Sequence, residues 1–437
     1  MLSGRSRGVQ ILGMILGAFA IILLKNSRLA VLHLENPVSG KAFARSQNYL
    51  SRKQFAMRLL LFSHSWNDPN AGASRVYNQL SEGLRNRGHE VQCLHRDDVS
   101  IHRLIEPVAS RLWLPTCMSR RASRESLPTF DVIMASNGML HPLFHRLKRE
   151  KTTALLVNHV HGLSYFDYQA TVTERLRGNR SSSSVHRWIT GPLQARRDIL
   201  GSRFADLTVV QNDRDLDFLA ERGVAPIVNI PLSVHPRIEE AARSVPDPGT
   251  RSPLRLLWFG SWIARKGANY LPRAFELIVD RCPDAHLTVG GTGLPAERLR
   301  TYFKPSLWPR IDFLPHISVE EQIALFGRSS IFLFPSISEG FGYALLEAMS
   351  LGLATVTTDT AFGADYLRDG QTALIVPSGS SLHLANAVVR LIEDASLRCS
   401  LAKNGQALSR NFSVERFISE YVEVFEYHRT NKSRTMA

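Results

Sequence analysis

The 437-residue sequence predicts an α/β protein with two doubly wound parallel sheets, one in each half of the chain. Short apolar runs alternate with helical patterns along both halves, which is typical of parallel sheets covered by helices. The chain is also too long for a single compact core. Between the halves, the run from Pro246 to Thr250, with Pro253 shortly after it, is the strongest linker signal.

These signals divide the chain into a leader, two α/β domains joined by a linker, and a final helix with a short tail. The boundaries that we predict are residues 1–56, 57–245, 246–253, 254–412 and 413–437.

The leader is strongly basic and contains one apolar run. It holds eight Lys and Arg residues and one acid, Glu35, so it carries +7 of the total formal charge of +14. The run from Val9 to Leu24 is a candidate membrane anchor, a signal-peptide core, or part of an upstream region if translation begins at Met57. Because more basic residues follow the run than precede it, an anchor would leave the chain on the cytoplasmic side.

Six apolar runs predict strands in the first half, and the first two flank a helix with apolar residues at Val76, Leu80 and Leu84. Gly88 is the expected residue after that helix. The predicted strands are 58–62, 90–94, 131–135, 154–157, 205–210 and 228–231.

Two loops of the first half carry candidate binding residues. Gly72 precedes the first helix, where it either lets a ligand approach the backbone or serves only as a turn residue. His161, followed by Gly162, lies just beyond the fourth strand, at the sheet edge where ligands bind in this class of fold. A lone histidine is also often purely structural.

Two further segments of the first half have a less certain pattern. Residues 171–203 contain seven arginines against Glu174 and Asp198, which suits phosphate, an anionic membrane or simply a solvated surface. Residues 96–128 lack a clear pattern, so we expect a surface excursion there, with a membrane-surface or acceptor-binding insertion as the alternative. The basic residues show little aromatic interleaving, which argues against nucleic-acid binding.

The second half again alternates strand-like and helical runs. The first strand is followed by Arg265 and Lys266 between Gly260 and Gly267, and two adjacent cations at a strand end suit a diphosphate. The glycines at 290–293 lack the spacing of a nicotinamide fingerprint. The predicted strands are 254–259, 286–289, 311–314, 331–334, 355–357 and 374–376, and Ser413 is expected to cap a final amphipathic helix.

The most informative stretch runs from Ser336 to Glu347. It leaves a buried strand at Pro335, passes two glycines, Gly340 and Gly342, and enters a helix. A helix N-terminus of this kind binds anions. Glu339 and Glu347 flank it with carboxylates, which accept hydrogen bonds from hydroxyl groups. A ligand that has both phosphate and hydroxyl groups is a sugar nucleotide.

The four cysteines are far apart in sequence and form no Cys-x-x-Cys pair. They therefore suggest neither a zinc site nor a disulfide framework, and we expect them to be reduced and buried.

The motifs resemble those of the retaining, nucleotide-sugar-dependent glycosyltransferases of family 4, which have the GT-B fold. The similarity covers essentially residues 57–428. Its most specific element is the Glu-x7-Glu signature from Glu339 to Glu347, supported by Lys266-Gly267 and by Asp369-Gly370. Where the family commonly has an arginine, this chain has Ser261, and Arg265 is a candidate substitute.

The resemblance implies two Rossmann-like domains that face a central cleft, with the donor mainly on the second domain. Glu347 would hold the nucleotide ribose, while Glu339 and the backbone of Gly340, Phe341 and Gly342 would contact the donor sugar. Lys266 would neutralise the diphosphate leaving group.

From the first domain, Gly72 would lie under the diphosphate, and His161 would lie near the reacting sugar. The final helix would cross back to this domain.

We therefore expect a retaining glycosyltransferase that takes a nucleoside diphosphate sugar as donor and a glycan or lipid-linked molecule as acceptor. No metal or other cofactor is expected, because cations and a helix N-terminus neutralise the charge. The expected location is the cytoplasm or the cytoplasmic face of a membrane. The alternatives are a sugar-nucleotide epimerase or hydrolase with the same fold, and a non-catalytic binding or scaffold protein.

Overall fold

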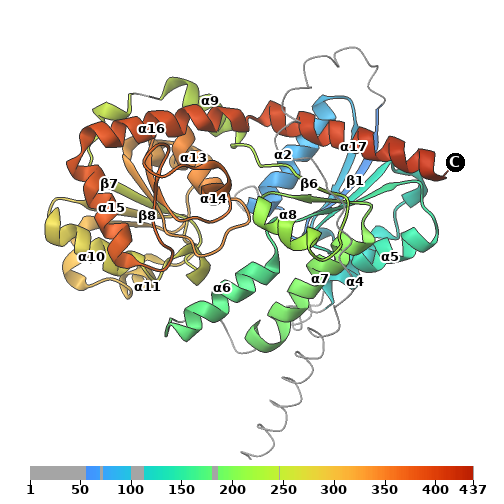
Figure 1. The fold of residues 1–437 in the computed structure, drawn as a ribbon, viewed down its shortest axis with the longest axis horizontal. Helices are drawn as coiled ribbons and strands as arrows, with labels where there is room; N and C mark the ends of the chain where they lie inside the picture. Colours follow the sequence, from blue (N-terminus) through green and yellow to red (C-terminus); the bar gives the residue numbers. More distant parts are fainter. Residues whose placement is uncertain (1–55, 69–71, 100–112, 180–185, 246, 437) are drawn as a thin grey trace, which may run out of the picture. The chain divides into compact units, whose positions relative to one another are not determined.

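The computed structural model describes residues 56–68, 72–99, 113–179, 186–245 and 247–436. The candidate anchor at 9–24 lies outside these residues. From Ala56 onward the chain forms one compact unit. Within it lie two six-stranded sheets, with helices on both sides of each sheet (Figure 1).

The first sheet contains all six strands predicted for this half, with ends that agree within two residues. Every pair of neighbours in it is parallel, and the order is β2-β1-β3-β4-β5-β6. The direction of winding reverses between β1 and β3, which is where ligands bind in open sheets of this kind. The strands are β1 (Arg58–Phe62), β2 (Glu90–Leu94), β3 (Val132–Ser136), β4 (Leu155–His159), β5 (Leu207–Val210) and β6 (Ile227–Asn229).

The sequence pattern did not predict several helices of this half, and α4 lies where no regular element was expected. Within the stretch 96–128, expected to be a surface excursion, α4 buries Leu114, Met118 and Ala122 against the sheet. Its nine residues carry too few apolar side chains for the helical period to stand out from the surrounding arginines. The main helices are α2 (Gly72–Asn86), α4 (Leu114–Ala122), α5 (His141–Arg149), α6 (Ser164–Leu176), α7 (Gly191–Phe204), α8 (Asp213–Ala220) and α9 (Pro236–Ala241).

The second sheet also has the predicted strands and is parallel throughout. Its order is β12-β11-β10-β7-β8-β9, so the winding reverses between β7 and β10. The loops that leave these two strands therefore meet at the edge where a nucleotide is expected. The strands are β7 (Arg255–Phe259), β8 (His286–Gly290), β9 (Ile311–Leu314), β10 (Ile331–Phe334), β11 (Ala354–Thr357) and β12 (Leu374–Ile375).

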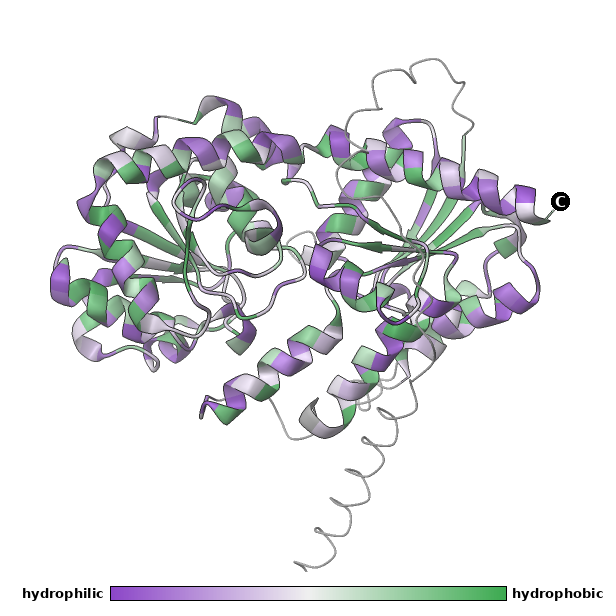
Figure 2. Cartoon of the chain, in the orientation of Figure 1, coloured by the Kyte–Doolittle hydropathy of each residue, from purple (hydrophilic) through white to green (hydrophobic). Residues whose placement is uncertain are grey.

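Helices cover both faces of this sheet, and the strands of both sheets are mostly hydrophobic (Figure 2). Such continuous apolar runs are expected for strands buried on two faces. The helices are α10 (Leu271–Arg281), α11 (Ala296–Arg300), α12 (Val319–Arg328), α13 (Tyr343–Ser350), α14 (Phe362–Tyr366), α15 (Ser381–Glu393), α16 (Ala395–Ser409) and α17 (Val414–Met436).

The last helix, α17, packs against α2 and β4 of the first half. Its amphipathic face buries Phe417, Tyr421 and Phe425 completely. The Tyr421 hydroxyl lies 2.9 Å from Nε2 of His159, at the end of β4. As predicted, Ser413 caps the helix, since its Oγ accepts a hydrogen bond from the Arg416 N–H.

Candidate functional site

The loops that follow β7 and β10 are joined by backbone hydrogen bonds. The carbonyl of Arg265, in a short 3₁₀ turn (Ala264–Lys266), accepts from the N–H groups of Ile337 at 2.7 Å and Ser338 at 3.3 Å. Gly267 ends this turn with a φ of 72°, and a Cβ atom there would lie 1.9 Å from the carbonyl oxygen of Pro335. Only glycine therefore allows the two loops to approach this closely.

Glu339 lies at the centre of a charged cluster that these loops build. Its carboxylate oxygens lie 2.6 and 2.8 Å from Nζ of Lys266, and Ser336 donates a hydrogen bond at 2.8 Å. Arg265 lies farther away, with Nη1 3.5 Å from the carboxylate. Burial alone would raise the pKa of Glu339, but the charges of Lys266 and Arg265 outweigh it and lower that pKa. The carboxylate is therefore held ionised.

Burial lowers the pKa of the Lys266 ammonium, and the charge of Glu339 opposes this effect. Beside it, Arg265 also faces Asp167 of α6, whose carboxylate lies 3.5 Å from Nε and raises the arginine pKa. The site thus holds two cations within reach of one ligand, each balanced by a carboxylate.

Glu347 is the most deeply buried carboxylate of the site, with a side chain only 1% exposed. It lies in the second turn of α13, which begins at Gly342 in a left-handed conformation (φ 114°). One oxygen accepts from Gln322 of α12 at 2.6 Å, and the other accepts from Arg75 of α2 at 2.6 Å. Two such donors fix the orientation of this buried carboxylate.

The loop at 338–340 rests directly on residues of the first half. A Cβ atom on Gly340 would lie 1.9 Å from the carbonyl oxygen of His161, so these backbones are in close contact. Asn212 donates to the Gly340 carbonyl at 2.6 Å, and Arg214 donates to the Glu339 carbonyl at 3.1 Å. Ser338 donates to Asp167 at 2.8 Å. The second wall of the site is therefore built by the first half.

His161 lies beside two other histidines, His159 and His64. Its ring lies 4.3 Å from that of His159 and 6.0 Å from that of His64, measured between centroids, and Gln211 lies 3.3 Å from its Nδ1. Burial lowers the pKa of His161 well below its ordinary value, and the two neighbouring histidines add to the shift. The ring is thus neutral near pH 7. Its buried Nε2 has no hydrogen-bond partner among the described residues.

Two of the predicted site residues are placed differently from the others. The Phe341 ring is buried against Phe362 and Phe412, so only its backbone faces the loop. Gly72 is the exposed first residue of α2, and no atom lies within 4 Å of a Cβ built on it. It is one turn away from Arg75 on the same helix.

The structure thus brings Glu339, Lys266, Arg265, Gly340 and His161 into one connected cluster. Sequence reasoning missed the polar side chains that link this cluster and Glu347 to the other elements, which are Arg75, Asp167, Asn212, Arg214 and Gln322. Only Arg75 had a usable signal, because it is a basic residue in the helical turn that follows Gly72.

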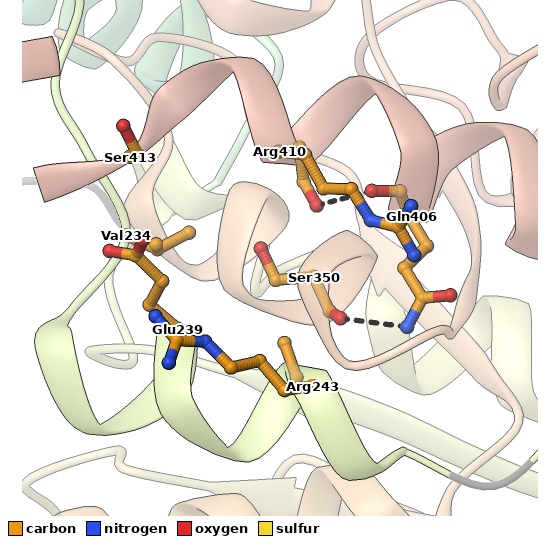
Figure 3. Close-up of a pocket in the computed structure, with 9 residues that line it drawn as sticks. Val234, Glu239, Arg243, Ser350, Gln406, Arg410 and Ser413 are labelled. Atoms are coloured by element: carbon orange, nitrogen blue, oxygen red, sulfur yellow. Dashed lines mark hydrogen bonds between the residues drawn. The ribbon is translucent and has the colours of Figure 1, made fainter. Parts of the chain in front are cut away.

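A pocket of about 400 Å³ lies elsewhere, at the C-terminal end of α13 (Figure 3). None of the predicted site residues lines it. Its polar groups mostly satisfy one another: Gln406 donates to the Ser350 carbonyl, and Ser409 donates to the Gln406 carbonyl. Glu239 accepts from the Val414 N–H. We therefore do not assign it to the reaction.

The described part of the chain contains no group of three or more His, Cys, Asp or Glu side chains placed to hold a metal ion. Nor does it contain a helix that is both long enough and apolar enough to span a bilayer. The four cysteines are unpaired, but they are partly exposed and not buried as expected. Cys93, for example, lies on the edge strand β2.

Comparison with known proteins supports a glycosyltransferase relationship. Residues 253–394 match the family model described as "Glycosyl transferases group 1". The capsular polysaccharide biosynthesis glycosyltransferase CapM of Staphylococcus aureus is 28% identical over 169 residues, which are 38% of this chain and 44% of that protein. Phosphatidyl-myo-inositol mannosyltransferase of Mycobacterium leprae (strain TN) is 30% identical over 171 residues, which are 39% of this chain and 45% of that protein. Each match therefore spans just under half of the relative.

Solved structures resemble the chain over most of its length. Sucrose-phosphate synthase from Thermosynechococcus elongatus superposes with a TM-score of 0.67 and 19% identity, covering 85% of this chain and 98% of that chain. At this identity the likeness concerns the fold, which is the GT-B fold expected from the motifs. The part of the chain that matches the group 1 glycosyltransferase model, residues 253–394, carries Lys266, Glu339 and Glu347.

Proposed function

We propose that this chain is a retaining glycosyltransferase that moves a sugar from a nucleoside diphosphate sugar to a glycan or lipid-linked acceptor. The observation that carries the proposal is the position of Glu339 between Lys266 and His161, at the carboxyl ends of β10, β7 and β4. The names of CapM and of the mannosyltransferase refer to a capsular polysaccharide and to a phosphatidylinositol acceptor, which supports these two acceptor classes.

The difficult part of the reaction is the separation of charge. The bond between the anomeric carbon and the diphosphate oxygen breaks while positive charge develops on the sugar ring. Lys266, Arg265 and the N-terminus of α13 would stabilise the negative charge of the departing diphosphate. These groups would do the work of a metal ion, so we propose that none is required.

The two carboxylates of the signature would have different partners. Glu339, together with the backbone at Gly340 and Gly342, would receive the hydroxyl groups of the donor sugar. Glu347 would receive the ribose hydroxyls. The neutral ring of His161, with an unpaired Nε2, is suited to a hydrogen bond with a sugar hydroxyl near the reacting carbon.

The first test is a saturation-transfer NMR screen of nucleotide sugars, followed by incubation of the best ligand with lipid and polysaccharide extracts. We expect Lys266→Ala and Glu347→Ala each to lower transfer by at least about tenfold, because each removes one positioned electrostatic partner. Lys304→Ala is the matched control, since Lys304 is exposed and pairs with Glu276 outside the site. Unchanged rates in both site variants would contradict the assignment.

The same experiment separates the alternatives. Donor turnover without any acceptor would identify an epimerase or hydrolase, and binding without turnover would identify a scaffold protein. NMR of the product determines the anomeric configuration, and inversion would refute the retaining mechanism.

We also propose that the chain contacts an anionic membrane through the end of α6, the π-helical turn His186–Thr190 and the start of α7; α6 and this turn both pack against α7. Leu176, Trp188, Ile189 and Leu193 are 45–83% exposed there. Exposed arginines, including Arg196, lie in the same segment. Apolar side chains beside cations suit a surface of anionic lipid.

This contact is tested by sedimentation of the full chain with phosphatidylglycerol or phosphatidylcholine vesicles. The variant Trp188→Ser/Leu193→Ser should bind less to the anionic vesicles than the wild type does. Both proteins contain the basic leader, so its contribution to binding cancels in the comparison. Equal binding of the two proteins would exclude this surface.

A further inference from the structure

Arg75 of α2 reaches across to the second half of the chain. Its Nη1 lies 2.6 Å from Glu347, and the guanidinium carbon lies 5.7 Å from the centre of the Tyr343 ring. The Arg75 side chain is 10% exposed and that of Glu347 is 1% exposed. This buried ion pair joins the helix that follows β1 to the helix that follows β10.

The hydrogen bonding of Arg75 is incomplete. A guanidinium has five N–H donors. Among the described residues, Glu347 accepts one of them, while the buried Nε donor has no partner. Burial and the charges of Arg75 and Arg237 lower the pKa of His235 to about 4, so the His235 ring is neutral and does not balance the charge of Arg75. A buried donor without an acceptor costs free energy that a ligand oxygen would recover.

The chemistry of the donor indicates which oxygen this is. In a nucleoside diphosphate the ribose is bonded to the diphosphate through a single methylene group. If Glu347 holds the ribose, a guanidinium in contact with Glu347 lies within a few bond lengths of the diphosphate. Guanidinium groups match phosphate oxygens with two parallel hydrogen bonds.

The position of Arg75 also favours this role. Arg265 and Lys266 come from the loop after β7, whereas Arg75 comes from α2, so its guanidinium adds a cation from the opposite wall of the site.

We propose, on the basis of the proposed function, that Arg75 is a donor-binding residue whose guanidinium holds the diphosphate while its contact with Glu347 orients that carboxylate for the ribose. The donor would then contact both halves of the chain, because Arg75 belongs to the first half and Glu347 to the second.

The test compares diphosphates with nucleosides. The full chain is titrated with UDP, GDP and ADP, and with uridine, guanosine and adenosine, using calorimetry and, for weak ligands, saturation-transfer NMR. Arg75→Met should weaken binding of the preferred diphosphate at least about tenfold more than binding of its nucleoside, which corresponds to about 1.4 kcal/mol. The matched control is Arg85→Met on the same helix, where Arg85 is exposed and donates to the Val91 carbonyl.

Each outcome decides the matter. If Arg75→Met weakens the binding of diphosphate and nucleoside equally, Arg75 only orients Glu347, and if it weakens neither, Arg75 has neither role. Both results overturn this inference but leave the proposed function standing. If the wild type binds none of the diphosphates, the proposed function fails and the inference fails with it. If Arg75→Met does not fold, Arg75→Lys retains a charge near Glu347, and it should still weaken diphosphate binding more than nucleoside binding.

Discussion

The contact between Gly340 and His161 predicts a large effect for the smallest substitution, Gly340→Ala. A Cβ atom there would lie 1.9 Å from the His161 carbonyl oxygen, 2.6 Å from its carbon and 2.9 Å from the Gly162 nitrogen. All three are backbone atoms, so no side chain can turn away. To restore ordinary contact distances, the two segments must separate by roughly 1.5 Å.

Such a separation breaks the hydrogen bonds that hold the loop. Asn212 donates to the Gly340 carbonyl at 2.6 Å and Arg214 donates to the Glu339 carbonyl at 3.1 Å. One neutral and one charged hydrogen bond together contribute about 2–4 kcal/mol to the free energy of unfolding. Because Glu339 moves with the loop, we also expect transfer to fall by about a hundredfold, the effect of a displacement of about 1 Å at a reacting centre.

Urea unfolding and the transfer assay check this prediction, with Gly327→Ala as the control. Gly327 lies near the end of α12, and no atom lies within 4 Å of the position that a Cβ would take there. Alanine there should leave the protein unchanged or stabilise it by up to about 1 kcal/mol. If Gly340→Ala unfolded and reacted like the wild type, the loop would not rest on His161 and the reasoning would be refuted.

Two further predictions concern stability. Gly267 and Gly293 have similar φ angles, 72° and 69°, but only a Cβ at Gly267 would meet the Pro335 carbonyl oxygen, at 1.9 Å. Urea unfolding should therefore show that Gly293→Ala lowers the free energy of unfolding by about 1–2 kcal/mol and that Gly267→Ala lowers it clearly more. Equal losses in the two variants would exclude the clash. Burial lowers the pKa of His159 to about 3, so its contribution to stability is complete above pH 6.5 and is lost as the pH falls toward 3. The difference in unfolding free energy between the wild type and His159→Leu should therefore narrow by about 1.4 kcal/mol per pH unit between pH 6 and 4. Other groups that titrate, such as Asp215, whose pKa burial raises to about 7, are present in both proteins and cancel in this difference. Parallel pH curves for the two proteins would contradict the prediction.

The strands were predictable because parallel strands buried on both faces are continuous apolar runs. The run from Ile331 to Phe334, for example, is fully apolar and coincides with β10. Helix α4 was not predictable in this way, since its apolar residues are few and lie among arginines.

The candidate site was predictable in part. The Glu-x7-Glu spacing placed Glu339 in the loop and Glu347 in the helix, and the structure adds an ion pair between Glu339 and Lys266. The catalytic and binding roles of these residues stay predictions. The expectation for Phe341 needed refinement, because its ring packs in the core and leaves only backbone groups at the loop.

By itself, the sequence determined the two sheets, the order of their strands along the chain, and the loop residues that lie at the strand ends. Local patterns suffice for these features, because they depend on apolar periodicity and on glycines at turns. Only the tertiary structure decided which groups form the opposite wall. Arg75 and Glu347 are separated by 272 positions in sequence, and Asn212 and Gly340 are separated by 128. A polar side chain on a helix surface carries no local signal of a partner at that distance, so contacts of this kind appear only when the chain is folded.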